Sequence, residues 1–122
     1  MYISVAKNFD EYVAIMAANS PHGLLMDSWR RLDFALRDYG DTLKPVVDSR
    51  NREAIEKAVS QDPALGPRVT DLIRGLRKLR NQVAHELIAL SGEEATARAR
   101  QAFMVIAALS RRASERYTTK SD

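Results

Sequence analysis

The chain has 122 residues, the usual size of one domain with a single hydrophobic core. Its apolar share of 45% excludes a disordered protein, and the absence of cysteine excludes disulfides and cysteine-bound metals. The net charge is a modest +3, and the sequence shows neither a signal-peptide pattern nor an apolar run long enough to span a membrane. We therefore expect a cytoplasmic protein, or the soluble part of a membrane-anchored one, with no membrane contact of its own and no cofactor.

The first half of the chain predicts two helices. Residues 1–19 form an accessory helix with a short amphipathic stripe made by Phe9, Val13, Met16 and Ala17. Ser20-Pro21 is a helix start signal, with Ser at the N-cap and Pro in the first turn. The helix behind it runs to Gly40 with 3.6-residue periodicity, and its stripe contains Leu25, Trp29, Leu32, Leu36 and Tyr39. We expect Trp29 in the core or in a dimer contact.

The second half predicts three more helices. A short one runs from Arg50 to about Gln61, with Glu53 and Glu56 as surface charges. Gly66-Pro67 begins a long helix whose apolar seam is Val69, Leu72, Ile73, Leu76, Leu79, Val83 and Leu87. Ser91 and Glu94 fit a capping box at the start of the last helix. Its inward face is predicted to hold Ala99, Ala102, Phe103, Ile106, Leu109, Ala113 and Tyr117.

Together these segments predict an all-α fold, because no segment alternates as a strand would. We expect an antiparallel helical bundle of four main helices with an N-terminal accessory helix. The accessory helix occupies residues 1–19, the bundle residues 20–118, and a disordered tail residues 119–122.

Arg80 is the residue that fits least well into an ordinary core helix. At 100° per residue it lies about 40° from Leu76, inside the apolar stripe of the long helix. Burying an unpaired guanidinium costs several kcal/mol, so Arg80 needs an internal ion pair or a cleft. Asn81 and His85 share a second face of this helix. One straight helix therefore does not bring Arg80 and His85 together, whereas a two-fold dimer could.

Basic side chains are concentrated near this place. Residues 1–60 carry eight basic and nine acidic side chains, and residues 61–122 carry eleven and seven. Arg74, Arg77 and Lys78 lie just before Arg80 and could attract a polyanion. A solvated helix face is the alternative interpretation of the same residues.

The string Leu76-Arg77-Lys78-Leu79-Arg80-Asn81-Gln82-Val83-Ala84-His85-Glu86 resembles the Arg-X4–6-His motif of HEPN domains, in the form of many small bacterial members. The resemblance covers about residues 20–115, since the helix behind Ser20-Pro21 and the last helix are also similar to those of the family. Leu87 departs from the tyrosine that HEPN toxins paired with nucleotidyltransferase antitoxins often carry, which disfavours that subgroup.

This resemblance implies a homodimeric, metal-independent endoribonuclease of the toxin or phage-defence type. His85 would help to deprotonate the ribose 2′-hydroxyl, Arg80 would stabilise charge on the phosphate, and Asn81 would orient either group. Arg74, Arg77 and Lys78 would bind the RNA backbone. RNA and an antitoxin or regulatory protein are the partners that this reading suggests.

Other interpretations remain open on the sequence alone. Arg80 can be a buried ion-pair residue, and Asn81 and His85 can cap the end of a helix. The domain as a whole can be a non-catalytic dimerisation or interaction module that binds a protein, a nucleotide or a nucleic acid. It can also be the regulatory domain of a membrane-anchored protein.

Overall fold

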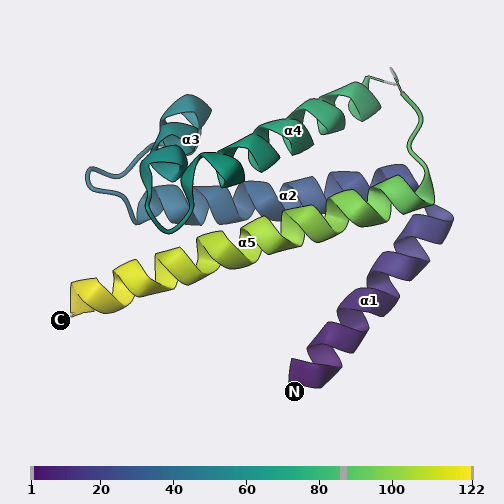
Figure 1. Cartoon of the computed structure of the whole chain (residues 1–122), viewed down its shortest axis with the longest axis horizontal. Helices are drawn as coiled ribbons and strands as arrows, with labels where there is room; N and C mark the ends of the chain where they lie inside the picture. Colours follow the sequence, from purple (N-terminus) through teal and green to yellow (C-terminus); the bar gives the residue numbers. More distant parts are fainter. Residues whose placement is uncertain (1, 86–87, 122) are drawn as a thin grey trace.

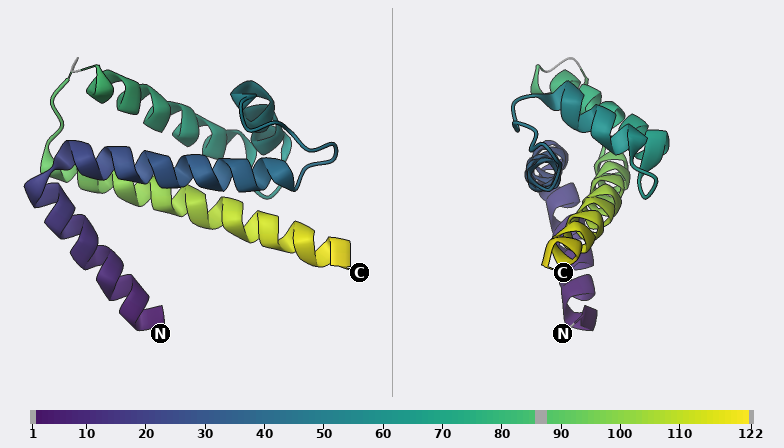
Figure 2. Two further views of the ribbon diagram at one scale, coloured as in Figure 1. Left: turned by 180° about the vertical axis from the view of Figure 1, so that it is seen from behind. Right: turned by 90° about the vertical axis from the view of Figure 1, so that its left-hand side faces the viewer.

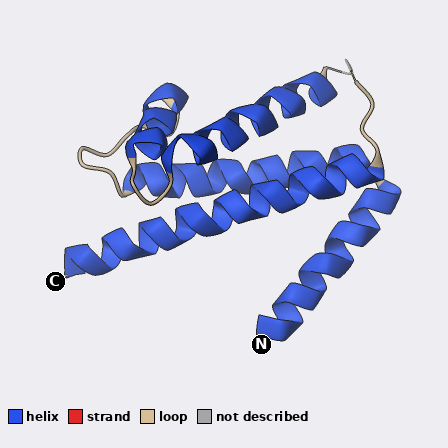
Figure 3. Ribbon diagram, in the orientation of Figure 1, coloured by secondary structure: helices blue, strands red, loops and turns tan. Residues whose placement is uncertain are grey.

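A computed structural model describes the backbone of residues 2–85 and 88–121 and the side chains of residues 8–85 and 88–117. The expected all-α class is confirmed, because the described residues form helices and loops without any strand (Figure 3). The helices are α1 (Tyr2–Asn19), α2 (Pro21–Asp41), α3 (Arg52–Gln61), α4 (Gly66–Ala84) and α5 (Gly92–Ser121). The backbone of residues 119–121, which were expected to form a disordered tail, belongs to α5, and Asp122 lies outside the described residues. None of the described helices is both long and apolar enough to cross a bilayer.

The long helices α2 and α5 form the centre of the molecule and share its most extensive contact. Both run in the same direction, and α4 runs back in the opposite direction along them (Figure 1). The short α3 packs against α4, near the beginning of that helix. Helix α1 diverges from the others at a wide angle, and its free end points away from the bundle (Figure 2). Successive long helices are thus antiparallel, while the pair that packs most closely is parallel.

Local capping explains where three of the helices begin. The Ser20 hydroxyl accepts a hydrogen bond from the backbone N–H of Gly23, at 2.9 Å, and Pro21 opens α2 as expected. The Ser91 hydroxyl accepts from the N–H of Glu94 at 3.1 Å, which confirms the predicted N-cap of α5. Asn51 caps α3 through the N–H of Ala54. These side chains satisfy amide groups that a helix start leaves without a partner.

The core divides into two clusters. The larger one joins α2, α3, α4 and α5, and it contains Trp29, Leu32, Tyr39, Val59 and Leu109. The smaller one joins α1 to the start of α2, to Val83 at the end of α4 and to the start of α5. All five predicted stripe residues of α2 are buried, so the periodicity of that helix is confirmed.

The predicted inward face of α5 is correct except at its end. Ala99, Ala102, Leu109 and Ala113 are buried, but Tyr117 is 53% exposed and does not belong to the core. Tyr117 instead lines an open hollow on the surface, together with Ala35 and Asp38 of α2. Val105, which the prediction omits, is buried instead.

A polar cluster around Asp62 holds the far end of the bundle together. The Asp62 side chain is fully buried and follows α3, and its carboxylate accepts from Tyr39 at 2.9 Å, from Arg112 at 3.0 Å and from Arg116 at 3.0 Å. Burial raises the pKa of Tyr39 to about 12, and the bond to Asp62 adds to this effect. Burial alone would raise the pKa of Asp62, but its hydrogen bonds outweigh burial and lower it.

Candidate functional site

The end of α4 determines where Asn81 and His85 lie. The helix ends at Ala84, and His85 is its C-cap, with its backbone N–H donating to the carbonyl of Asn81 at 3.1 Å. Both side chains are exposed on the same face of the last turn. Glu86 and Leu87 lie outside the described residues. Leu87 is the predicted last residue of the apolar seam, so the end of that seam also lies outside them.

Arg80 is half-buried, as its position in the apolar stripe predicts. Its Nη1 donates to Oδ1 of Asn81 at 3.0 Å. Its Nε is buried and has no hydrogen-bond partner among the described residues. Arg80 also makes no ion pair with any residue in this part of the chain. The described residues therefore offer no carboxylate that would make Arg80 an internal salt-bridge residue. A buried guanidinium N–H without a partner is unusual in a folded protein.

His85 lies at one end of a shallow groove on α4, which we call the α4 groove. The groove is lined by Arg74, Arg77, Lys78, Asn81, Gln82 and His85. Five of the six predicted site residues therefore share one surface, and the sixth, Arg80, reaches it through its hydrogen bond to Asn81. A second depression, between α3 and α4, continues the α4 groove because both are lined by Arg74 and Arg77.

Glu56 on α3 changes the expected charge of the α4 groove. The sequence predicts a surface charge at Glu56, and this is wrong, because the residue is only 4% exposed. Its Oε1 accepts from Arg77 and lies 3.4 Å from Nε of Arg74. Arg77 is thus a partly buried ion-pair residue that joins α4 to α3. Ile55 and Val59 form the buried apolar side of α3, and the position of Glu56 directly after Ile55 is the signal in the sequence for its burial.

Lys78 differs from these two arginines. It is exposed and makes no ion pair within the described part of the chain. Because Arg74 is also 61% exposed, its guanidinium can reach solvent while it stays near Glu56. The α4 groove therefore presents Lys78 and Arg74 to a ligand, with the imidazole of His85 at its end.

Groups of His, Asp and Glu that could hold a metal ion do not occur among the described residues. Comparison of the chain with models of protein families, with curated proteins and with solved structures gives no match.

Proposed function

We propose that the chain is a HEPN-like helical bundle that cleaves RNA without a metal ion, at a site formed by two copies of the chain. One observation supports this most directly: a half-buried Arg80 without a carboxylate partner in the described residues is bonded to Asn81, which shares the α4 groove with His85. Such activity would fit a toxin or a phage-defence protein.

The proposed chemistry needs one base and one fixed cation. A neutral His85 imidazole removes the proton of a ribose 2′-hydroxyl, whose oxygen then attacks the adjacent phosphorus. The bond from phosphorus to O5′ breaks, O5′ takes a proton from water, and the His85 imidazolium returns its own proton to the solvent. The products are a 2′,3′-cyclic phosphate and a free 5′-hydroxyl. Arg80 stabilises the charge on the phosphate oxygens with its planar fork of donors.

A second copy is needed because Arg80 and His85 leave α4 in different directions. Arg80 is half-buried and does not line the α4 groove, whereas His85 is exposed within it. Two α4 ends related by a two-fold axis would place His85 of one copy beside Arg80 of the other. Asn81 would then hold the guanidinium at the shared boundary.

The first test is RNA cleavage in EDTA. We expect wild type to cut single-stranded RNA, and His85→Ala and Arg80→Ala to lose about 100-fold or more in rate. Arg68→Ala is the matched control, because it removes an exposed arginine from the other end of the same helix. Wild type that is inert on several RNAs, or variants that cut as fast as wild type, would contradict an endoribonuclease and leave the interaction module as the better reading.

A second test asks whether the site is shared. His85→Ala and Arg80→Ala are mixed after unfolding and refolding together. If each site takes its histidine from one copy and its arginine from the other, half of the dimers are mixed and each keeps one intact site, so activity returns to about a quarter of wild type. A mixture as inactive as the separate variants, or a strictly monomeric protein in sedimentation, excludes the shared site.

A further inference from the structure

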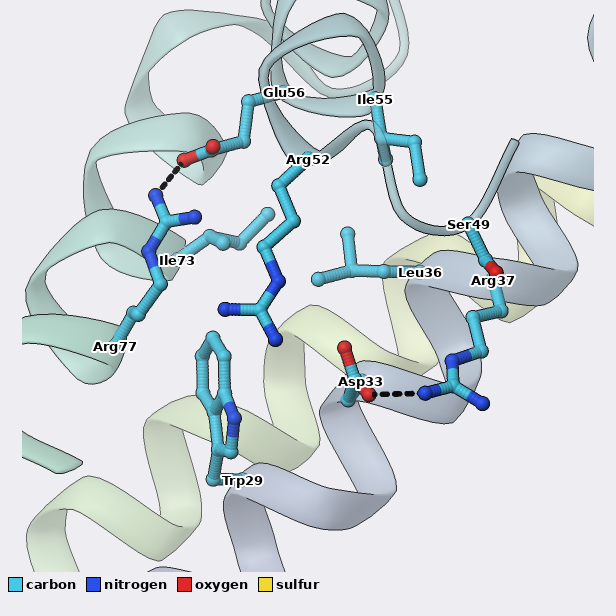
Figure 4. A pocket seen from close by; sticks show the side chains of 10 residues that line it. All are labelled: Trp29, Asp33, Leu36, Arg37, Ser49, Arg52, Ile55, Glu56, Ile73 and Arg77. Atoms are coloured by element: carbon cyan, nitrogen blue, oxygen red, sulfur yellow. Dashed lines mark hydrogen bonds and ion pairs between the residues drawn. The ribbon is translucent and has the colours of Figure 1, made fainter. Parts of the chain in front are cut away.

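A hollow between α2, α3 and α4 lies apart from Arg80, Asn81 and His85. Its walls are apolar and are formed by Trp29, Leu36, Ile55 and Ile73. Charged side chains surround its mouth, from all three helices (Figure 4). Apolar walls with a few polar groups are the usual composition of a small-molecule site.

The charges at the mouth do not cancel. Asp33 pairs with Arg37 at 3.1 Å, and Glu56 pairs with Arg77. Arg52, the first residue of α3, also lines the hollow, but its guanidinium has no hydrogen bond or ion pair to any described residue. Arg52 is therefore the one cation at the mouth that pairs with no described carboxylate, and its guanidinium lies between Trp29 and Asp33 (Figure 4).

The Arg52 side chain itself lies inside the hollow. Its side chain crosses the hollow and ends between Trp29 and Asp33 (Figure 4). The cavity that remains measures about 20 Å³, room for roughly one water molecule. Because Arg52 is an exposed residue without a partner among the described side chains, an outward turn of its side chain breaks no hydrogen bond or ion pair there and opens the hollow.

We propose that this hollow binds a small flat anion with one negative charge, an aromatic carboxylate, with Arg52 as its clamp. The planar guanidinium matches a carboxylate with two parallel hydrogen bonds. The ring of the ligand replaces the Arg52 side chain beside Trp29 and Ile73. A polyphosphate is disfavoured, because only one cation is unpaired and the carboxylates of Asp33 and Glu56 repel further negative charge.

The single tryptophan of the chain makes this testable without a known ligand. Benzoate does not absorb at the excitation wavelength of tryptophan near 295 nm, so Trp29 emission can be followed directly. We expect benzoate to change this emission saturably, with half-saturation in the millimolar range that suits so small a ligand. Benzamide, which has the same shape without the charge, and acetate, which has the charge without the ring, should each bind at least 10-fold more weakly.

Variants locate the binding. Arg52→Gln should weaken benzoate binding about 10-fold or more, whereas Arg50→Gln, an exposed arginine outside the hollow, should leave it unchanged. A linear response without saturation would overturn the proposal. So would equal binding of benzamide, or equal binding by Arg52→Gln. Each result is independent of RNA cleavage, because neither arginine belongs to the proposed RNA site.

Discussion

Asp62 shows how a single buried charge can connect distant parts of this chain. Its carboxylate receives hydrogen bonds from α2 through Tyr39 and from α5 through Arg112 and Arg116. The N–H of Ala64 also donates to it, at 3.0 Å. Removing a charge that several donors share leaves those donors without a partner, and this is more costly than losing one contact.

We expect Asp62→Asn to lower the free energy of unfolding by about 2–4 kcal/mol at pH 7. The folded-state pKa of Asp62 is lowered below its unfolded value, which is near 3.9. The ionised carboxylate therefore contributes its full share to the free energy of unfolding above that pH, and this share is lost as the pH falls through the folded-state pKa. Urea denaturation should therefore show a large gap between wild type and variant at pH 7 and a smaller one in acid. Asp38→Asn, at an exposed residue, is the control, and a gap that does not depend on pH would contradict the assignment.

The sequence predicts the burial of a single residue well only when that burial depends on the residue's position around its own helix. The half-burial of Arg80 follows from its angle to Leu76, which needs no knowledge of other helices. The burial of Glu56 and Asp62 depends on arginines of α4 and α5 that approach only after folding. No spacing within α3 reveals those partners.

Among the helices, α1 depends on few contacts. Tyr12 donates a hydrogen bond to Asp27 of α2, and Phe9 packs edge-to-face on Phe103 of α5 with ring centroids 4.4 Å apart. Burial would raise the pKa of Asp27, but hydrogen bonds from Tyr12 and two arginines outweigh it and lower the pKa to about 2. Val13 is the only residue of the described part of α1 that is fully buried. Helix α1 should therefore open more readily than the bundle.

Tyr12→Phe should make local opening of α1 more frequent without unfolding the rest of the chain. The loss of one hydrogen bond to a charged group, worth about 1 kcal/mol or more, should speed amide hydrogen exchange in α1 about 5-fold. Asp27 keeps its arginine partners, so exchange in α2 and α5 should not change. Ile15→Ala, at a position that is 60% exposed, should leave exchange in α1 as it is. Faster exchange throughout the chain would show that α1 belongs to the cooperative core.

Helix starts are predictable here because capping is local, and helix ends are less so. Ser20 and Ser91 identify the starts of α2 and α5 by residue type and spacing alone. Helix α3 begins two residues later than expected, because Asn51 serves as its cap. The apolar seam of α4 predicts continuation to Leu87, whereas the helix ends at Ala84. Periodicity marks a face that can be buried, and it does not mark where a chain turns away.

At the scale of the whole molecule, the parallel pair of α2 and α5 is the feature that the sequence does not predict. Amphipathic stripes show that these helices bury one side, but they do not show which helices meet. The direction of the pair follows from the position of α4, which returns the chain to the end where α2 began (Figure 1). The predicted bundle of four main helices therefore stays a proposal beyond its all-α class.

A substitution at Leu32 tests whether the packing of α2 against α5 provides most of the stability of the fold. Leu32 is completely buried in the larger cluster, so Leu32→Ala should lower the free energy of unfolding by about 2–5 kcal/mol. Phe34→Ala removes a larger side chain from the same helix, but Phe34 is 57% exposed and should cost about 1 kcal/mol at most. Thermal denaturation followed by circular dichroism compares the two. A larger loss for Phe34→Ala would mean that its face is covered in solution.

The position of Glu56 limits how the α4 groove can change. One carboxylate both anchors α3 to α4 and offsets the charge of Arg74 and Arg77. A substitution that frees these two cations for a polyanion also weakens the attachment of α3. At this position a substitution that strengthens the attraction for nucleic acid therefore lowers the stability of the fold. A variant that improves both properties would need a second substitution that holds α3 in place.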